Sequence, residues 1–97
     1  MFPTVKSGDV PAVEKPERII AGVGARIAEL RRQKGWTQQD LADRLRMEPQ
    51  SVQRIERGTN LTIRSLVALA RTLGVPTAAL FEAPKGLERR PGRPRKP

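Results

Sequence analysis

The sequence predicts an all-α fold of about five helices, and two observations carry this prediction. Apolar residues between positions 19 and 83 recur three or four residues apart, the spacing that gives a helix one buried face. Threonines suited to helix starts and glycines suited to helix ends divide this region into short segments. We therefore expect a flexible N-terminal arm over residues 1–18, a helical DNA-binding domain over residues 19–83 and a basic Pro/Gly/Arg tail over residues 84–97.

The first helix is expected to begin between Glu17 and Val23 and to run to Lys34. Gly35 follows as the C-terminal stop, because glycine readily adopts the left-handed conformation that ends a helix. Two glycines near its beginning leave the start of this helix open. Its apolar residues lie at helical spacing: Ile20, Val23, Ile27 and Leu30.

Residues 37–58 predict two short helices joined by a tight turn, which is a helix-turn-helix unit. Thr37 followed three residues later by Asp40 matches a capping box, in which side chain and backbone groups at a helix start bond reciprocally. Trp36 is placed to pack on Leu41 across this cap. The second helix is therefore expected to begin at Thr37.

The third helix is expected to have Pro49 in its first turn and Gly58 as its C-terminal cap. Ala42 is small where the second and third helices should approach most closely, so a larger side chain there would separate them. The buried positions of the pair are expected to be Leu41, Ala42, Leu45, Met47, Val52 and Ile55.

The fourth helix is expected to have Thr62 as its N-cap and to stop at Gly74. Pro76 or Thr77 then opens a short fifth helix that ends near Phe81. The inward-facing residues of the fourth helix are Leu66, Leu69, Ala70 and Leu73.

Polar residues occupy the side of the third helix that is not buried. Glutamine can bind adenine through two hydrogen bonds, and arginine can bind guanine in the same way. An ordinary solvated helix face has the same composition, and the residues alone favour neither interpretation. The residues concerned are Gln50, Ser51, Gln53, Arg54 and Arg57.

Composition excludes several classes of function. The 97 residues include no cysteine and no histidine, so a disulfide framework, a thiolate metal site and the commonest general base are all absent from the chain. We expect neither enzymatic activity nor a cofactor. The sequence has no secretory signal and no apolar run near the roughly 20 residues of a membrane span, which predicts a cytoplasmic protein on the nucleoid. A core of about sixty residues is marginal by itself, which favours a dimer.

The net charge of +9 is unevenly distributed. Residues 84–97 contain six Lys or Arg and one Glu, a net +5, which leaves +4 for residues 1–83. Such an excess favours a polyanionic partner, and double-stranded DNA is the usual one. A membrane surface is the weaker alternative, because it needs a basic amphipathic helix and the prolines of RRPGRPRKP prevent one.

Three segments carry a resemblance to a known family: GARIAELRRQKGWTQQDLADRL, SVQRIERG and SLVALARTLGVPTAALF. In this order and spacing they resemble the Cro and lambda-repressor-like (XRE) family of helix-turn-helix proteins, over about two thirds of the chain. The resemblance implies a compact lambda-repressor-like bundle of about five helices. It also implies a transcriptional regulator that binds operator DNA as a homodimer, with its third helix in the major groove.

The resemblance favours base reading over simple solvation for the third helix. It implies base contacts from Gln50, Ser51, Gln53 and Arg54. It implies phosphate contacts, which position the protein without specifying sequence, from Gln38, Arg57 and Asn60.

Two residues near this surface have competing interpretations. Glu56 could read a cytosine, but the resemblance implies an ion pair with Arg31 that joins the first helix to the third. Trp36 could stack on a base, but its position at the start of the second helix favours packing on the core.

Three departures from the family pattern concern the turn, the third helix and the loop after it. Arg46 stands where the family usually has a left-handed glycine, and this costs roughly 1 kcal/mol unless the turn differs. Pro49 stands where some relatives carry a base-reading side chain, and we give it no reading role because it has no donor. The loop 59–61, which holds Asn60, is about one residue shorter than the commonest family form.

The fifth helix and its approach hold more apolar surface than capping the core requires. A two-fold interface would use Val75, Leu80 and Phe81. The alternative, which we weigh equally, is that Leu80 and Phe81 only close the bundle. The resemblance favours the dimer, because members of the family usually bind DNA as dimers.

The C-terminal tail resembles the core of an AT-hook, a short chain that lies in the minor groove of A·T-rich DNA. Proline keeps such a chain extended and glycine removes bulk, but Pro91 stands where the motif has arginine. Solvated tail, nonspecific phosphate binding and minor-groove insertion all stay open. The residues concerned are Arg90, Arg93, Arg95 and Lys96.

The sequence thus predicts a sequence-specific transcriptional regulator of the XRE type. Two alternatives stay open. An antitoxin-type regulator would use its arm or tail to bind a partner protein. A sequence-indifferent nucleoid-associated protein would bind DNA through the basic tail.

Overall fold

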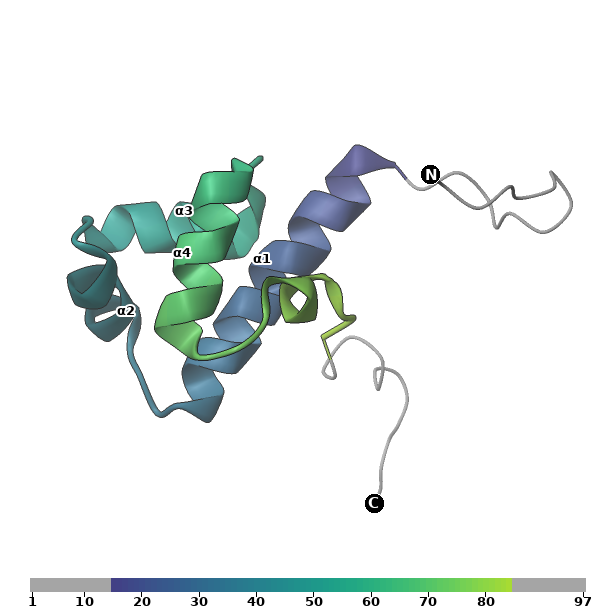
Figure 1. Ribbon diagram of the computed structural model, residues 1–97. Coiled ribbons are helices and arrows are strands. Elements are labelled where there is room, and N and C mark those ends of the chain that lie inside the picture. The colour runs from purple at the N-terminus through teal and green to yellow at the C-terminus, as the bar shows by residue number, and fades with distance from the viewer. Residues whose placement is uncertain (1–14, 85–97) are drawn as a thin grey trace, which may run out of the picture.

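The computed structural model describes residues 15–84, and this part of the chain forms four α-helices and one 3-10 helix, with no strand. The elements are α1 (Pro16–Gln33), α2 (Gln38–Leu45), α3 (Pro49–Gly58), α4 (Ile63–Leu73) and the 3-10 helix η2 (Thr77–Phe81) (Figure 1). The expected all-α fold is therefore observed. No helix within these residues combines the length and the apolar character that crossing a membrane requires.

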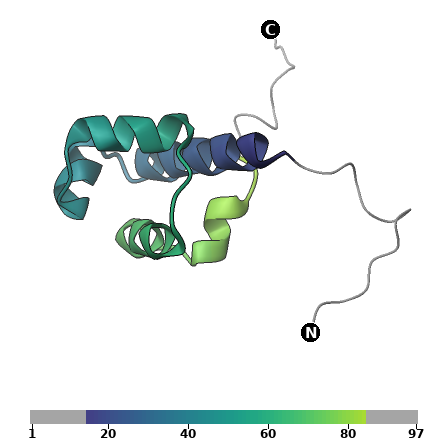
Figure 2. The same cartoon turned by 90° about the horizontal axis from the view of Figure 1, so that it is seen from above.

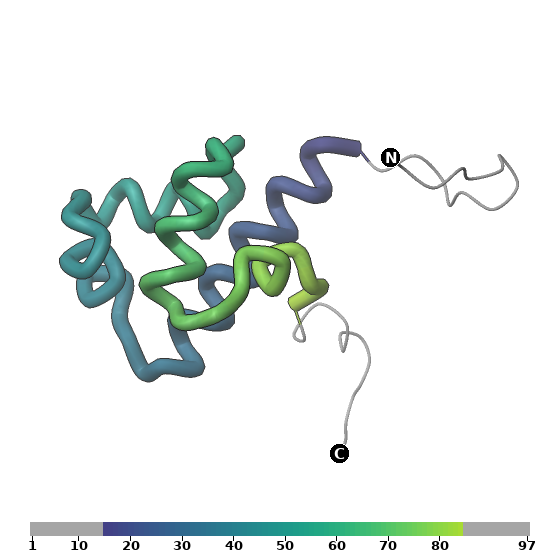
Figure 3. Tube along the Cα trace, viewed as in Figure 1, coloured from purple at the N-terminus to yellow at the C-terminus, as the bar shows by residue number. Residues whose placement is uncertain are grey.

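The helices form two layers, which Figure 2 shows from above. Helices α1 and α3 pack against each other and form the first layer. Helix α4 and η2 pack against each other and form the second layer. Helix α2 packs on α3 and α4 and lies at the edge of the molecule remote from the N-terminus of α1 (Figure 3). The core between these elements consists of Val23, Ile27, Leu30, Leu41, Ala42, Val52, Ile55, Leu66, Leu69, Ala70, Leu73 and Leu80.

Helix α1 begins at Pro16, earlier than the sequence predicted. Proline is suited to a first helical position because its φ is already helical and its missing N–H would be unpaired there. Lys15 is the N-cap, and its carbonyl accepts from the N–H of Arg18 at 2.9 Å. The boundary placed at residue 18 between arm and domain is thus too late. The helix ends at Gln33, and Gly35 follows with a φ of 76°.

Gly24 lies where α1 and α3 approach most closely. A Cβ atom at this position would lie 2.5 Å from the carbonyl oxygen of Ile55 and 2.7 Å from that of Glu56. Glycine is therefore required by the contact between the two helices. This requirement depends on a contact between distant parts of the chain, so the local sequence around Gly24 does not show it.

The start of α2 has the predicted capping box. Thr37 Oγ1 accepts from the N–H of Asp40 at 3.0 Å, and the N–H of Thr37 donates to Asp40 Oδ2 at 2.9 Å. The N–H of Thr37, its hydroxyl and the nearby Arg44 lower the pKa of the Asp40 carboxyl below its ordinary value of 3.8. The helix proper begins one residue after the cap, at Gln38.

The turn between α2 and α3 keeps the left-handed conformation despite the departure at Arg46. This residue has φ 60° and ψ 47°, and it is the one non-glycine residue with positive φ among those described. The N–H of Met47 donates to the carbonyl of Ala42 at 2.9 Å, which closes the turn. The surrounding helices therefore tolerate the cost of a side chain at this position. Ala42 itself is fully buried, as its small size predicted.

Helix α4 has the predicted ends, but the fifth helix differs from the prediction. Thr62 Oγ1 accepts from the N–H of Ser65 at 3.0 Å, and Gly74 ends α4 with a φ of 74°. The fifth segment is a 3-10 helix of five residues, in which the N–H of Ala79 donates to the carbonyl of Pro76 at 2.9 Å. So short a segment gives few α-helical hydrogen bonds for the residues it orders, so the tighter 3-10 turn is observed.

Leu80 corrects one expectation about the dimer interface. Its exposed fraction is 0%, and it belongs to the hydrophobic core. A side chain that is already covered within one chain has no surface to offer a second copy. Val75 is half-buried and packs against the core, whereas Phe81 is 54% exposed.

Candidate nucleic-acid interface

Helix α3 divides into a buried and an exposed side. Val52 and Ile55 lie in the core between α1, α2 and α3. The opposite side carries four exposed polar side chains, while Ser51 is half-buried. The exposed residues are Gln50, Gln53, Arg54 and Arg57. Three of the four expected base contacts, Gln50, Gln53 and Arg54, therefore lie on one accessible helix surface, together with the expected phosphate contact Arg57.

The two ends of α3 are built differently. Pro49 lies in its first turn, after the N-cap residue Glu48. At the other end, Thr59 Oγ1 donates to the carbonyl of Arg54 at 2.8 Å, and Gly58 adopts a φ of 116° beside Ala21 of α1. Proline thus favours the helical start, while a hydrogen bond and packing on α1 hold the C-terminal end.

A buried ion pair joins α1 to α3. Arg31 donates from Nε to Glu56 Oε2 at 2.6 Å and from Nη2 to Glu56 Oε1 at 3.2 Å. The two side chains are 11% and 7% exposed. Arg31 Nη1 also donates to the carbonyl of Trp36 at 2.7 Å, so the pair holds the loop before α2 as well. This pair is the one that the family resemblance implied, and removing one partner would leave the other charge buried and uncompensated.

Gln38, an expected phosphate contact, lies at the first residue of α2 and is half-buried. Its Nε2 donates to Glu56 Oε1 at 3.0 Å, so its amide is attached to the ion pair. Asn60 is exposed in the loop between α3 and α4. The structure thus places Gln38 beside α3 through Glu56, and Asn60 just beyond the end of that helix.

Trp36 packs partly against the core, in keeping with the interpretation that favoured packing over base stacking. Its ring also makes cation–π contacts: the guanidinium of Arg44 lies 4.1 Å from the ring centroid and Lys34 Nζ lies 5.5 Å from it.

Sequence reasoning missed the role of Arg26. This residue is 9% exposed, and its guanidinium donates to Glu29 at 2.8 Å, to Glu82 at 3.0 Å and to the carbonyl of Ala79 at 2.9 Å. It therefore fastens η2 to α1. Only the three-residue spacing from Arg26 to Glu29 was visible in the sequence, since the other two acceptors lie more than fifty residues away.

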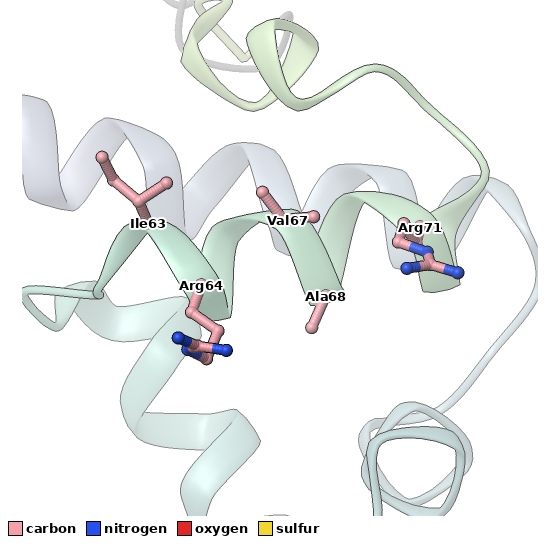
Figure 4. A pocket seen from close by; sticks show the side chains of 5 residues that line it. All are labelled: Ile63, Arg64, Val67, Ala68 and Arg71. Atoms are coloured by element: carbon pink, nitrogen blue, oxygen red, sulfur yellow. The ribbon is translucent and has the colours of Figure 1, made fainter.

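A second surface that sequence reasoning missed lies on α4. Ile63 is 76% exposed and Val67 is 38% exposed, and they lie one turn apart on the side of α4 that the core leaves exposed. Figure 4 shows the shallow groove that they line together with Arg64, Ala68 and Arg71. The four-residue spacing of Ile63 and Val67 was the available signal.

Other expectations concern metals and the tail. Among residues 15–84, no group of three or more acidic, cysteine or histidine residues could hold a metal ion. The tail residues Arg90, Arg93, Arg95 and Lys96 lie outside the described residues, as does most of the N-terminal arm.

A short helix with one side in the core, a tight turn before it and an exposed polar surface is the arrangement of a helix-turn-helix DNA-binding domain. The profile of the Helix-turn-helix family matches residues 27–80. The chain belongs to this family, in the XRE type that its motifs resemble, and is a DNA-binding transcription regulator with no enzymatic role.

Solved structures include several similar proteins. The restriction-modification controller protein C.AhdI from Aeromonas hydrophila is 32% identical, with a TM-score of 0.60 over 64% of this chain and 96% of that protein. The wild-type restriction-modification controller protein C.Esp1396I is 34% identical, with a TM-score of 0.58 over 65% of this chain and 83% of that protein. A hypothetical transcription factor, NHTF from Neisseria, shares the fold at 23% identity, with a TM-score of 0.65 over 82% of this chain and 94% of that protein. No curated protein matches the sequence.

Proposed function

We propose that this protein is a sequence-specific transcriptional regulator that binds a two-fold symmetric operator as a homodimer. Helix α3 enters the major groove, where Gln50, Gln53 and Arg54 contact base edges and Ser51 contributes a further hydroxyl. The similarity to two restriction-modification controller proteins supports a role in controlling a small gene set.

The observation that carries this proposal is the exposed side of α3. Its polar side chains are accessible, while Val52 and Ile55 hold the same helix in the core. Pairing and packing leave Glu56 unavailable for base reading, so the exposed side chains of the helix are the proposed reading residues.

Phosphate contacts complete the proposed interface. The first turn of α2 leaves backbone N–H groups without an intrahelical acceptor, and the amide of Gln38 lies beside them. Arg57 at the end of α3 and Asn60 in the following loop extend these contacts. Such contacts fix the position of α3 without selecting a sequence.

The proposed two-fold interface uses the α4 surface and η2. Ile63, Val67 and Phe81 are large apolar side chains left exposed by the fold. Covering them in a second copy removes apolar area from water, and a core of this size gains from such support. Val75 contributes only through its half-exposed part, and Leu80 has no part in this interface.

The test is selection of bound sequences from a random duplex pool, followed by titration of the selected site against scrambled DNA at physiological salt. We expect a two-fold symmetric site that binds about a thousandfold more tightly than scrambled DNA. Enrichment of A·T-rich DNA without symmetry would contradict the proposal and favour binding through the tail.

A further inference from the structure

Glu56 lies on the recognition helix but faces away from the proposed DNA surface. Its carboxylate is 7% exposed and accepts hydrogen bonds from two residues on two other elements, Arg31 of α1 and Gln38 of α2. A purely structural ion pair would need Arg31 alone. The bond from Gln38 connects the pair to a residue expected to touch phosphate.

The chemistry of this contact fixes the orientation of the Gln38 amide. A carboxylate only accepts hydrogen bonds, so the NH2 group of Gln38 must face Glu56 and its carbonyl oxygen must face away. One N–H of this group is bound to Glu56 Oε1 at 3.0 Å, and the second N–H stays available to another acceptor. Without Glu56, a glutamine side chain has several rotamers and no reason to favour this one.

The charge of Glu56 is balanced within the same network. A carboxylate so close to Gln38 would repel any phosphate bound there, since like charges at short range disfavour each other. Arg31 cancels this repulsion by donating two hydrogen bonds to the carboxylate. The pair therefore holds the amide of Gln38 without opposing an anion beside it.

We infer that Glu56, held by Arg31, is a positioning residue for DNA binding: it orients the amide of Gln38 toward a backbone phosphate. The inference rests on the proposed phosphate contact of Gln38. It means that the phosphate contact of Gln38 is coupled to α3 through Glu56, a residue that itself touches no DNA.

The experiment is a double-mutant cycle on DNA affinity, with the full chain and the selected operator. Replacing both members of the ion pair, Arg31→Met with Glu56→Met, removes the anchor without stranding a charge. We expect affinity to fall about tenfold for operator and scrambled DNA alike, the same loss as Gln38→Ala, with one fewer phosphate contact in the salt dependence. In the Gln38→Ala background, the methionine pair should then have no further effect.

A second variant keeps the test decisive if the methionine pair does not fold. Glu56→Asp retains the charge and shortens the side chain by one methylene, which draws the carboxylate away from Gln38. It should reproduce the loss caused by Gln38→Ala and should not add to it. Gln39→Ala is the matched control, because Gln39 is the neighbouring glutamine on α2 but bonds to the exposed Asp43 at 2.8 Å.

The outcomes separate the inference from the proposed function. Full affinity in the methionine pair or in Glu56→Asp, with a loss in Gln38→Ala, would overturn the positioning role and leave the phosphate contact in place. Unchanged affinity in Gln38→Ala would overturn both the contact and its positioning. A failure of the wild-type protein to select any operator would instead contradict the proposed function.

Discussion

At the scale of single residues, Arg54 and Arg57 are an instructive pair, because both are exposed arginines on α3 and only one is expected to read a base. Arg54→Ala should weaken binding to the selected operator by about 1–3 kcal/mol, and binding to scrambled DNA by less. Arg57→Ala should weaken both by the same amount and reduce the salt dependence by about one phosphate contact. Titration of the two variants against both DNAs tests the assignment. Equal losses on both DNAs for Arg54→Ala would contradict its reading role.

Asp40 gives a prediction about acid stability. Its pKa is lowered by the N–H of Thr37, by the hydroxyl of Thr37 and by Arg44, so the charged carboxylate is favoured in the folded protein. A lowered pKa means that this stabilisation is fully present above the ordinary value of 3.8 and is lost as the pH falls below it.

The measurement is the free energy of unfolding in urea of wild type and Asp40→Asn, at pH values above and below 3.8. The wild type should be more stable well above pH 3.8, and the difference should shrink as the pH falls below that value. A constant difference across the range would mean that the cap does not depend on the charge.

Residue identities allowed some of these roles to be predicted and hid others. The capping box of Thr37 and Asp40 was readable because both partners lie three residues apart. The role of Arg26 was not readable, since two of its acceptors belong to η2 and to the segment after it. Local sequence contains the spacing of a helix cap, but it does not contain the distance between chain segments that meet only after folding.

At the scale of elements, the contact between α1 and α3 gives the sharpest prediction. A Cβ on Gly24 would overlap the carbonyls of Ile55 and Glu56, which are backbone atoms that cannot rotate away. Gly24→Ala should therefore destabilise the fold by about 1–3 kcal/mol, although alanine is the better helix former. Gly22→Ala is the matched control, because a Cβ there meets nothing within 4 Å.

Equilibrium unfolding of the two glycine variants tests this packing. The control should be neutral or more stable, by up to about 1 kcal/mol, from the higher helix propensity of alanine. Equal stabilisation of both variants would show that the two helices do not approach as closely as the structure indicates.

The elements also mark the limit of sequence reasoning about the fold. Helices α2, α3 and α4 were predictable because caps, prolines and glycines coincide with the apolar spacing at their ends. The beginning of α1 and the 3-10 form of η2 were not. The 3-10 form of η2 depends on weak local preferences that packing decides, since η2 lies against α1 and α4. The start of α1 lies among exposed residues and is marked by Pro16, a local signal that the two nearby glycines obscured.

At the scale of the whole molecule, positive charge favours the proposed DNA interface and opposes the proposed dimer interface. The α4 surface presents Arg64 and Arg71 beside its apolar residues, and neither α4 nor η2 contains an acidic residue. Two copies that meet through this surface bring like charges together at its rim. The apolar contact of Ile63, Val67 and Phe81 must therefore outweigh a repulsion that salt screens.

Self-association and DNA binding should consequently respond to salt with opposite signs. Dimerisation, measured without DNA by sedimentation equilibrium, should strengthen as salt rises, because the arginine repulsion is screened while the apolar contact persists. Affinity for scrambled DNA should fall steeply over the same range, because each counterion that a phosphate contact releases gains less free energy when the salt concentration is already high. Ile63→Ser should abolish the dimer and leave the monomer folded, whereas Ile19→Ser, a change at an exposed apolar residue on α1, should leave the dimer intact. A dimer that weakened with salt, or that survived Ile63→Ser, would require an interface other than the α4 surface.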